Sequence, residues 1–270
     1  MNTFKGTVHV GLGDIIYMKA QFDAVRHNYS KIELTFNKHW TGVHDKDYPQ
    51  FLKELGQLLF SEPPYLITDD DHPHLSLVDI HNHYNIPVVK PELAHILCKG
   101  DSLNLDNEYV ALSTKLRYFN RTKFNEIAPQ FFEIINQLTN KYKVVVLGER
   151  IVEMNAEYQY WGANEIYSIY DDIINNIPPE KLVDLTIPVL GITTPKLSQI
   201  QQDCLILNKA KFAVTFGVGG NFCMATAVAN TIGYRIDNDI STDVIYCKDY
   251  PNAIITKDYN KFLQTLQSYL

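Results

Sequence analysis

Short apolar runs and amphipathic segments alternate along this chain in the order strand, helix, strand. In the first 100 residues, strands are predicted at 7–10, 31–36 and 65–68, and helices at 14–28, 48–60 and 91–97. After a polar stretch at 99–108, strands are predicted at 109–113, 143–147, 183–185, 212–216 and 244–246. The helices expected there cover 124–140, 164–177, 196–208, a segment after 220, and 258–269.

This alternation in both halves predicts an α/β protein with two doubly wound, Rossmann-like lobes that face a cleft. The polar stretch sets the boundary near 98–107, with an N-terminal lobe at 1–100 and a C-terminal lobe at 108–270. The run KIELTF at 31–36 alternates apolar and polar residues, whereas KVVVL at 143–147 has the continuous apolar character of a central parallel strand.

The most informative segment is FAVTFGVGGNFCMATAVANTI at 212–232, where a β-branched run meets glycines and then a small-residue helix. Such a turn leaves free backbone N–H groups at the positive end of the helix dipole, where phosphate groups bind. Gly219 and Gly220, followed by Asn221, let the backbone approach a ligand closely. A related element, TVHVGLGDIIYMKAQFDAV, opens the chain at 7–25. Two such elements facing each other favour an enzyme that handles an activated sugar.

The first glycine turn carries Gly11, Gly13 and Asp14 where the strand gives way to the helix. Asp14 has two interpretations: it caps the helix, or it accepts a proton from a sugar hydroxyl in the cleft. A dinucleotide fingerprint is disfavoured because its third glycine would fall at Ile16.

The densest basic cluster follows the strand at 109–113 and contains Lys115, Arg117 and Arg121. It is either a solvated loop or a set of cations that grips an anionic diphosphate, and we expect one or two of its members to bind. Glu149 and Arg150 follow the strand at 143–147 and form either a surface ion pair or a ribose or base contact.

Composition narrows the functional classes. A net charge of −7 argues against a non-specific nucleic-acid binder. The four cysteines are far apart, which favours reduced core thiols. The Asp- and His-rich segment 69–74 could ligate a metal, but a solvated or acceptor-facing loop is preferred, so no metal site and no cofactor are predicted. The chain shows no secretory or membrane-spanning run, and a cytoplasmic location is expected.

The opening GLGDIIYMKAQFDAVRHNYSKIELTF resembles the start of GT-B glycosyltransferases of the heptosyltransferase type. The second half follows that family in the order of its segments, which are YVALSTKLR, KVVVLGER, VDLT, LSQIQQDCLILNKA and FAVTF. The family's Asp-Ser-Gly-Pro turn and its helical His are replaced here, with Val218 at the Asp, Asn221 at the Pro and Cys223 at the His.

The resemblance implies an inverting, metal-independent transfer of a sugar from a nucleotide-sugar donor to a hydroxyl of a glycan or lipid-linked acceptor, as in polysaccharide biosynthesis. The C-terminal lobe would bind the donor diphosphate through 219–221 and the basic cluster, with Asp14 as general base. The alternatives are a nucleotide-sugar 2-epimerase, a pyruvyl-type transferase on the same fold, or a non-catalytic nucleotide- or glycan-binding protein. The replacements at Val218 and Cys223 favour the last of these.

Overall fold

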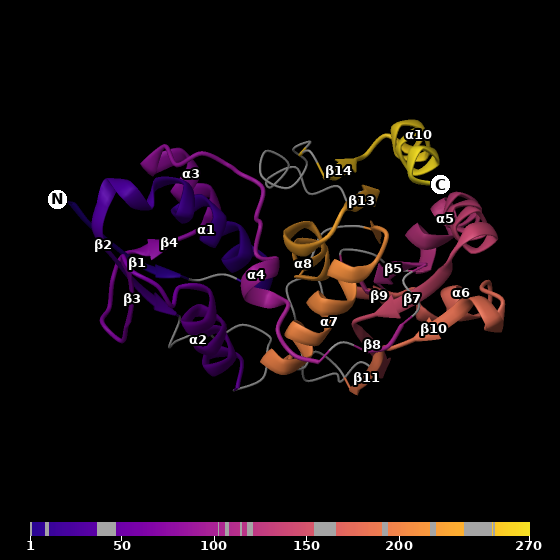
Figure 1. Cartoon of the computed structure of the whole chain (residues 1–270), viewed down its shortest axis with the longest axis horizontal. Helices are drawn as coiled ribbons and strands as arrows, with labels where there is room; N and C mark the ends of the chain where they lie inside the picture. Colours follow the sequence, from indigo (N-terminus) through magenta and orange to yellow (C-terminus); the bar gives the residue numbers. More distant parts are fainter. Residues whose placement is uncertain are drawn as a thin grey trace.

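Two large parallel β-sheets, each with its own helices, make up most of the described part of the chain (Figure 1). The computed structural model describes residues 2–8, 11–36, 47–101, 103–105, 108–113, 115–117, 121–153, 166–190, 194–216, 220–234, 250 and 252–270. Within these ranges only the backbone is described at 78, 115–117, 121, 123, 151–153, 166–168 and 190.

The first sheet has four strands in the order β3-β2-β1-β4. Its strands are β1 (Asn2–Val8), β2 (Tyr29–Phe36), β3 (Tyr65–Thr68) and β4 (His74–Leu75). The helices that follow in the chain are α1 (Leu12–Val25), the short η1 (Arg26–Asn28), α2 (Tyr48–Leu59), α3 (Leu77–Tyr84) and α4 (Ala94–Leu97). Apolar residues of α1, α2 and α3 share one core cluster with one face of this sheet.

The opposite face of the first sheet is polar. Glu33 pairs there with Lys5 at 2.7 Å and with Lys31 at 2.6 Å, and Leu66 is 42% exposed. In the described ranges, helices therefore cover this sheet on one face, and the doubly wound arrangement holds for the second sheet.

The second sheet has six parallel strands in the order β10-β7-β5-β12-β13-β14. Its strands are β5 (Tyr109–Ser113), β7 (Lys143–Leu147), β10 (Leu182–Asp184), β12 (Ala213–Phe216), β13 (Thr231–Tyr234) and β14 (Ala253–Thr256). The strand order reverses between β5 and β12, and ligands of open α/β sheets bind outside the carboxyl ends of the strands at such a point.

Helices cover both faces of the second sheet. The helices α7 (Leu197–Lys209) and α8 (Gly220–Val228) belong to one core cluster, and α5 (Arg121–Lys141), α6 (Tyr170–Ile174) and α10 (Tyr259–Tyr269) to the other. The remaining elements are η3 (Pro179–Lys181), the parallel pair β8 (Glu149–Glu153) and β11 (Ile187–Leu190), and the antiparallel pair β6 (Lys115–Arg117) and β9 (Ile166–Ser168).

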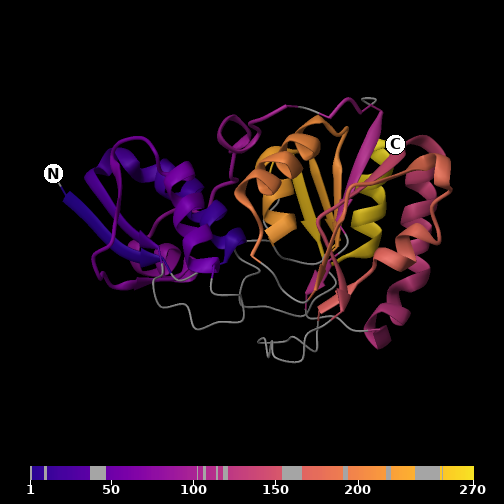
Figure 2. The same cartoon turned by 90° about the horizontal axis from the view of Figure 1, so that it is seen from below.

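The two sheets are joined by the packing of α1 on α8, and Figures 1 and 2 show the helices of the first sheet turned toward α7 and α8. The contact is close at its start: a Cβ added to Gly220 would lie 2.9 Å from Leu12 Cδ2. One apolar cluster consequently runs from the first sheet through α1 and α8 to the second sheet.

Most predicted elements are confirmed, with three exceptions. The helix expected at 164–177 is wrong, because its described part is the strand β9 followed by the short α6. The β-branched Ile166 and the aromatic Tyr167 favour a strand, and β9 pairs with β6. The first strand begins at Asn2, five residues before its predicted start, and the helix α3 and the strands β4, β6, β8, β11, β13 and β14 were not predicted. The strand expected at 244–246 and the end of the one expected at 7–10 lie outside the described residues.

The packing of α2 on β2 supplies a test of this fold. A Cβ at Gly56 would lie 2.3 Å from Phe36 Cε2 and 2.5 Å from Cζ, within the buried core. We expect Gly56→Ala to lower the free energy of unfolding by about 1–2 kcal/mol, because overpacking outweighs the gain in helix propensity. The exposed neighbour Gln57→Ala is the control in a urea titration, and a stabilised Gly56→Ala variant would contradict this packing.

Candidate functional site

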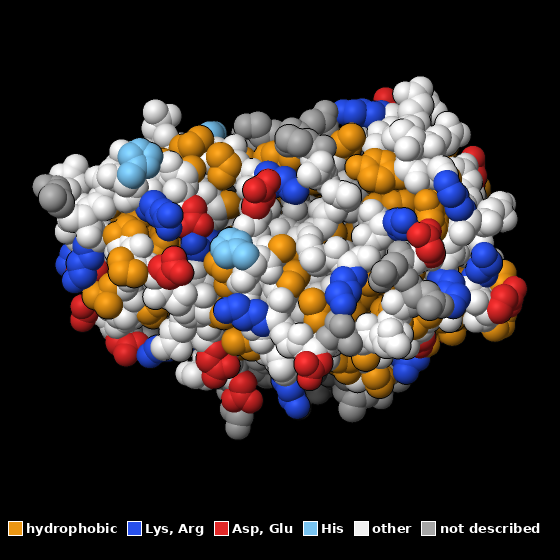
Figure 3. Space-filling view, in the orientation of Figure 1, with side chains coloured by type: hydrophobic (Ala, Val, Ile, Leu, Met, Phe, Trp, Pro, Cys, Tyr) orange, Lys and Arg blue, Asp and Glu red, His pale blue; other side chains and the backbone are white. Residues whose placement is uncertain are grey.

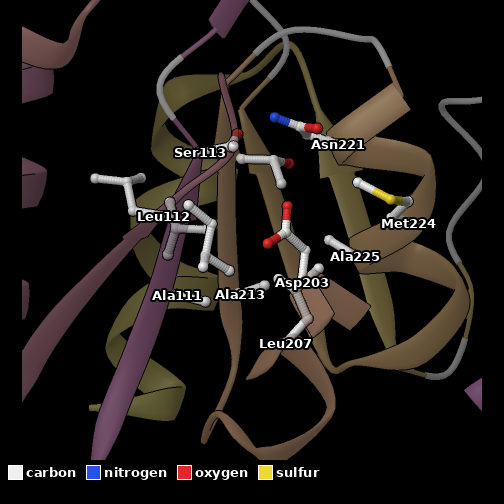
Figure 4. A pocket seen from close by; sticks show the side chains of 13 residues that line it. Ala111, Leu112, Ser113, Asp203, Leu207, Ala213, Asn221, Met224 and Ala225 are labelled. Carbon is white, nitrogen blue, oxygen red and sulfur yellow. The ribbon is translucent and has the colours of Figure 1, made fainter. Parts of the chain in front are cut away.

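A narrow pocket lies at the point where the strand order of the second sheet reverses (Figure 4). It is formed by the ends of β5, β7 and β12 together with α7 and α8. Its lining residues are Ala111, Leu112, Ser113, Leu147, Gly148, Asp203, Leu207, Ala213, Val214, Thr215, Asn221, Met224 and Ala225. The pocket thus occupies the ligand-binding position of an open parallel sheet.

The loop after β7 is pressed against the first turn of α8. Gly148 has φ +95°, and a Cβ at this position would lie 2.5 Å from Asn221 Nδ2. Only glycine adopts this backbone without strain and leaves space for the amide of Asn221. The Asn221 side chain is thereby held at the rim of the pocket.

The pocket contains a buried carboxyl group. Asp203, on α7, is 5% exposed, and its Oδ1 accepts a hydrogen bond of 2.7 Å from Gln199 Nε2. Burial raises the pKa of this carboxyl to about 6, and the negative charge of Glu149 acts in the same direction, while the Gln199 hydrogen bond opposes it. The Thr215 hydroxyl, on β12, is also buried and has no hydrogen-bond partner among the residues that the structure describes.

The first turns of α1 and α8 lie together through the contact of Leu12 with Gly220. In α1, the Gly11 N–H donates to Asp14 Oδ2 at 3.2 Å, and the Leu12 N–H donates to the Tyr48 hydroxyl at 3.2 Å. In α8, the first turn has no acidic residue. Helix N-termini favour anions, and of these two only that of α8 lacks a negative charge of its own.

The structure brings several of the predicted residues together. Gly11, Gly13 and Asp14 form the start of α1, beside Gly220 and Asn221 at the start of α8. Glu149 begins β8 and acts electrostatically on Asp203 in the pocket.

The basic cluster is described in its backbone only. Lys115 and Arg117 are the end residues of β6, and Arg121 is the first residue of α5, while their side chains lie outside the described part of the chain. Gly219 also lies outside it. Their roles as donor-binding residues stay predictions.

Arg150 contacts another cluster. Its guanidinium lies 4.4 Å from the centre of the Tyr170 ring, and the Tyr170 hydroxyl donates to Asp184 Oδ2 at 2.5 Å. Asp184 Oδ1 accepts from the backbone N–H and the hydroxyl of Thr186. Arg150 therefore has a stacking role on α6 in this structure.

The Asp- and His-rich segment closes the end of the first sheet. Asp69 pairs with Lys53 at 2.8 Å, and the backbone of His72 is bonded to the hydroxyl of Thr7 in both directions. Among the described residues, no group of three or more His, Cys, Asp or Glu side chains could hold a metal ion. Cys98 and Cys204 are free thiols.

Asp203, Thr215 and Ser113 were not predicted as site residues from the sequence. Asp203 carried the clearest signal, because it falls on the apolar stripe of its helix together with Ile200 and Leu207. A carboxylate at such a position is buried against a core, where charged side chains are rare unless paired.

Comparison with known proteins identifies solved structures of similar overall arrangement. No known sequence family matches the chain, and no curated protein matches it. The E. coli heptosyltransferase WaaC, solved with ADP-2-deoxy-2-fluoro heptose, is 9% identical with a TM-score of 0.48, and the match covers all of both chains. E. coli ADP-heptose LPS heptosyltransferase II is 10% identical with a TM-score of 0.46 over 98% of both chains.

A third solved structure is the iron-containing dodecameric glycosyltransferase TibC from enterotoxigenic E. coli H10407. It is 13% identical with a TM-score of 0.49, over 98% of this chain and 78% of TibC. These proteins are of the type that the sequence resembles. Because their TM-scores are below 0.5, we base the function on the residues of the site itself.

The surface adds two observations. On the face seen in Figure 3, Lys and Arg side chains are interspersed with Asp and Glu, so the described side chains there form no continuous basic track of the kind that binds nucleic acid. None of the helices in the described ranges has the length and apolarity needed to cross a membrane.

The buried carboxyl predicts a pH dependence of stability. Because the pKa of Asp203 is about 6 in the folded state and near 4 when unfolded, the folded state holds the extra proton between these values. Its contribution to the free energy of unfolding is complete below pH 4, and it decreases as the pH rises toward 6. Asp203→Asn stays neutral and should be more stable than the unsubstituted protein at pH 7.5, by about 1–3 kcal/mol.

Chemical denaturation at pH 4.5 and pH 7.5 measures this difference. Thr226→Val removes a buried hydroxyl that does not ionise in this pH range, so it is the control and should change the free energy of unfolding equally at both pH values. If the free energy of unfolding differs between Asp203→Asn and the unsubstituted protein by the same amount at both pH values, burial of an ionisable carboxyl does not explain that difference.

Proposed function

We propose that this protein is a glycosyltransferase that moves a sugar from a nucleotide-sugar donor to an acceptor hydroxyl, with inversion and without a metal ion. The observation that carries the proposal is the contact between the first turns of α1 and α8, through Leu12 and Gly220. It sets a carboxylate, Asp14, beside a helix N-terminus without acidic residues. These are the two groups that the reaction requires, a proton acceptor and an anion site.

The donor diphosphate binds at the start of α8 in this proposal. Backbone N–H groups of Gly220 and its neighbours point along the helix axis toward the ligand, and the helix dipole favours negative charge there. Further contacts to the diphosphate come from Lys115, Arg117, Arg121 and the backbone of Gly219. Glu149 accepts a hydrogen bond from a hydroxyl of the nucleoside. Negative charge develops on the departing diphosphate in the transition state, and its stabilisation is expected to contribute most to the rate. In this proposal these groups stabilise that charge without a metal ion.

Asp14 acts as the general base. It accepts the proton of the acceptor hydroxyl as the oxygen attacks the anomeric carbon and the bond from that carbon to the diphosphate oxygen breaks. A single displacement of this kind inverts the configuration. The N-terminal lobe, residues 1–100, presents the acceptor and the C-terminal lobe, residues 108–270, binds the donor, in the GT-B layout. A glycan or lipid-linked sugar is the acceptor class, and the cytoplasm is the location where nucleotide sugars are available.

A nucleotide-sugar panel tests the donor assignment. UDP-, GDP-, ADP- and CMP-sugars are screened by thermal shift, and at least one should raise the melting temperature, because binding to the folded state stabilises it. Product analysis with donor alone separates transfer from epimerisation, since an epimerase needs no acceptor. If no nucleotide or nucleotide sugar shifts the melting temperature, the proposed function is wrong.

Asp14→Asn tests the catalytic assignment. With an active donor we expect kcat to fall by about 10²- to 10⁴-fold, because the amide cannot accept the proton. The donor Kd and the melting temperature should change little, since the Asn oxygen still accepts the Gly11 N–H. Asp258→Asn is the matched control: Asp258 caps α10 through the N–H groups of Asn260 and Lys261, and its variant should keep full turnover. Full turnover by Asp14→Asn would remove Asp14 from this role.

A further inference from the structure

Two buried polar side chains of the pocket have hydrogen-bonding capacity that the protein leaves unused. Asp203 accepts one bond from Gln199 through Oδ1, while its Oδ2 has no hydrogen-bond partner in the described part of the chain. The Thr215 hydroxyl, on a residue 2% exposed, has none either. Unpaired buried polar groups are rare in folded proteins and point to a ligand or a water molecule.

The two side chains belong to one pocket. Both residues line the pocket, and Figure 4 shows the Asp203 carboxyl directed from α7 toward Asn221. The cavity volume is about 10 Å³, close to the ~10–15 Å³ that one water molecule needs. It therefore accepts a single small polar group and excludes a ring or a phosphate.

The position of the pocket relates it to the proposed donor site. Asn221 belongs to the first turn of α8, and Ser113 and Gly148 stand at the ends of β5 and β7. A ligand whose diphosphate lies at the start of α8 is thus within reach of the pocket with its neighbouring groups. A carboxylate repels phosphate oxygens but accepts hydrogen bonds from hydroxyl groups.

We infer that Asp203 and Thr215 bind one hydroxyl group of the nucleotide-sugar ligand, with the carboxylate as acceptor and the threonine hydroxyl as second partner. This assignment rests on the proposed function and adds to it the group that α7 recognises. The hydroxyl belongs either to the ribose or to the transferred sugar, and both present the same chemistry to the pocket.

Binding measurements on isosteric variants test the inference. The nucleotide with the largest thermal shift in the panel is titrated calorimetrically at pH 7.5 in three forms: the nucleoside diphosphate, its 2′,3′-dideoxy form and the nucleotide sugar. Asp203→Asn should weaken binding about tenfold, because the single Asn oxygen stays with Gln199 and an NH2 group replaces the charged acceptor. Thr215→Val should weaken binding about three- to tenfold, because it removes the hydroxyl. Thr226→Val is the matched control, and binding should be unchanged. The Thr226 hydroxyl is also buried and has no hydrogen-bond partner within the described ranges, but Thr226 does not line the pocket.

The three ligands distinguish the source of the hydroxyl. If the hydroxyl belongs to the ribose, both variants bind the nucleoside diphosphate more weakly and bind the dideoxy form as the unsubstituted protein does. If the hydroxyl belongs to the transferred sugar, both variants lose affinity for the nucleotide sugar only. Melting curves establish that the variants are folded, and Thr215→Val keeps the test valid if Asp203→Asn does not fold.

Three results would overturn the assignment. Unchanged binding of all three ligands to both variants would show that the pocket binds no ligand hydroxyl and holds a structural water molecule instead. Tighter binding of every ligand to Asp203→Asn would show that the carboxylate only repels the diphosphate. Neither of these outcomes affects the proposed function. Absence of nucleotide binding to the unsubstituted protein would instead overturn the proposed function, and this assignment with it.

Discussion

The packing of α1 against α8 is the constraint on which the rest of the structure depends. All residues of α1 from Ile15 to Phe22 are buried, the polar Lys19 and Gln21 included, so this helix must be covered on every side. The first sheet, α2 and α3 cover part of it, and α8 covers the remainder. Gly220 permits the close approach because any side chain there would meet Leu12. The same contact that completes the core brings two helix N-termini together, and the proposed reaction takes place beside them.

The reversal of strand order in the second sheet has a comparable consequence. The chain crosses from β10 at one edge to β12 at the centre, and α7 makes that crossing. This path lays α7 beside α8 on the same face, so that Asp203 comes close to Thr215 and Asn221. A buried carboxyl without a cationic partner lowers the stability of the folded protein at neutral pH. Local losses of folding stability are expected at ligand-binding sites, where a residue is present for binding and does not stabilise the fold.

The elements that could be predicted are those whose pattern reflects a local cause. KIELTF alternates because one face of β2 is polar, with Glu33 between two lysines, whereas KVVVL is apolar throughout because helices cover both faces of β7. The helix α3 was missed although Ser76 and Asp79 form a capping box, since the neighbouring Asp and His residues suggested a loop. The strand β13 was missed because TIGY is short and contains Gly233, which is placed there by the close approach of Ile255 and Thr215.

The candidate site was predictable only in part, because only some of its residues belong to a local sequence pattern. The starts of α1 and α8 can be recognised from the local sequence, because a glycine turn before a helix is a common anion-binding arrangement. Asp203 and Thr215 acquire their meaning from tertiary placement, since neither belongs to a turn and each lies within a regular element. A single polar residue on an apolar helical stripe is thus as informative as a glycine motif once the topology is known. In the binding mode that we propose, the glycine turn at the start of α8 binds the anionic group and the Asp203 carboxyl binds a neutral group, so that the two together orient one ligand.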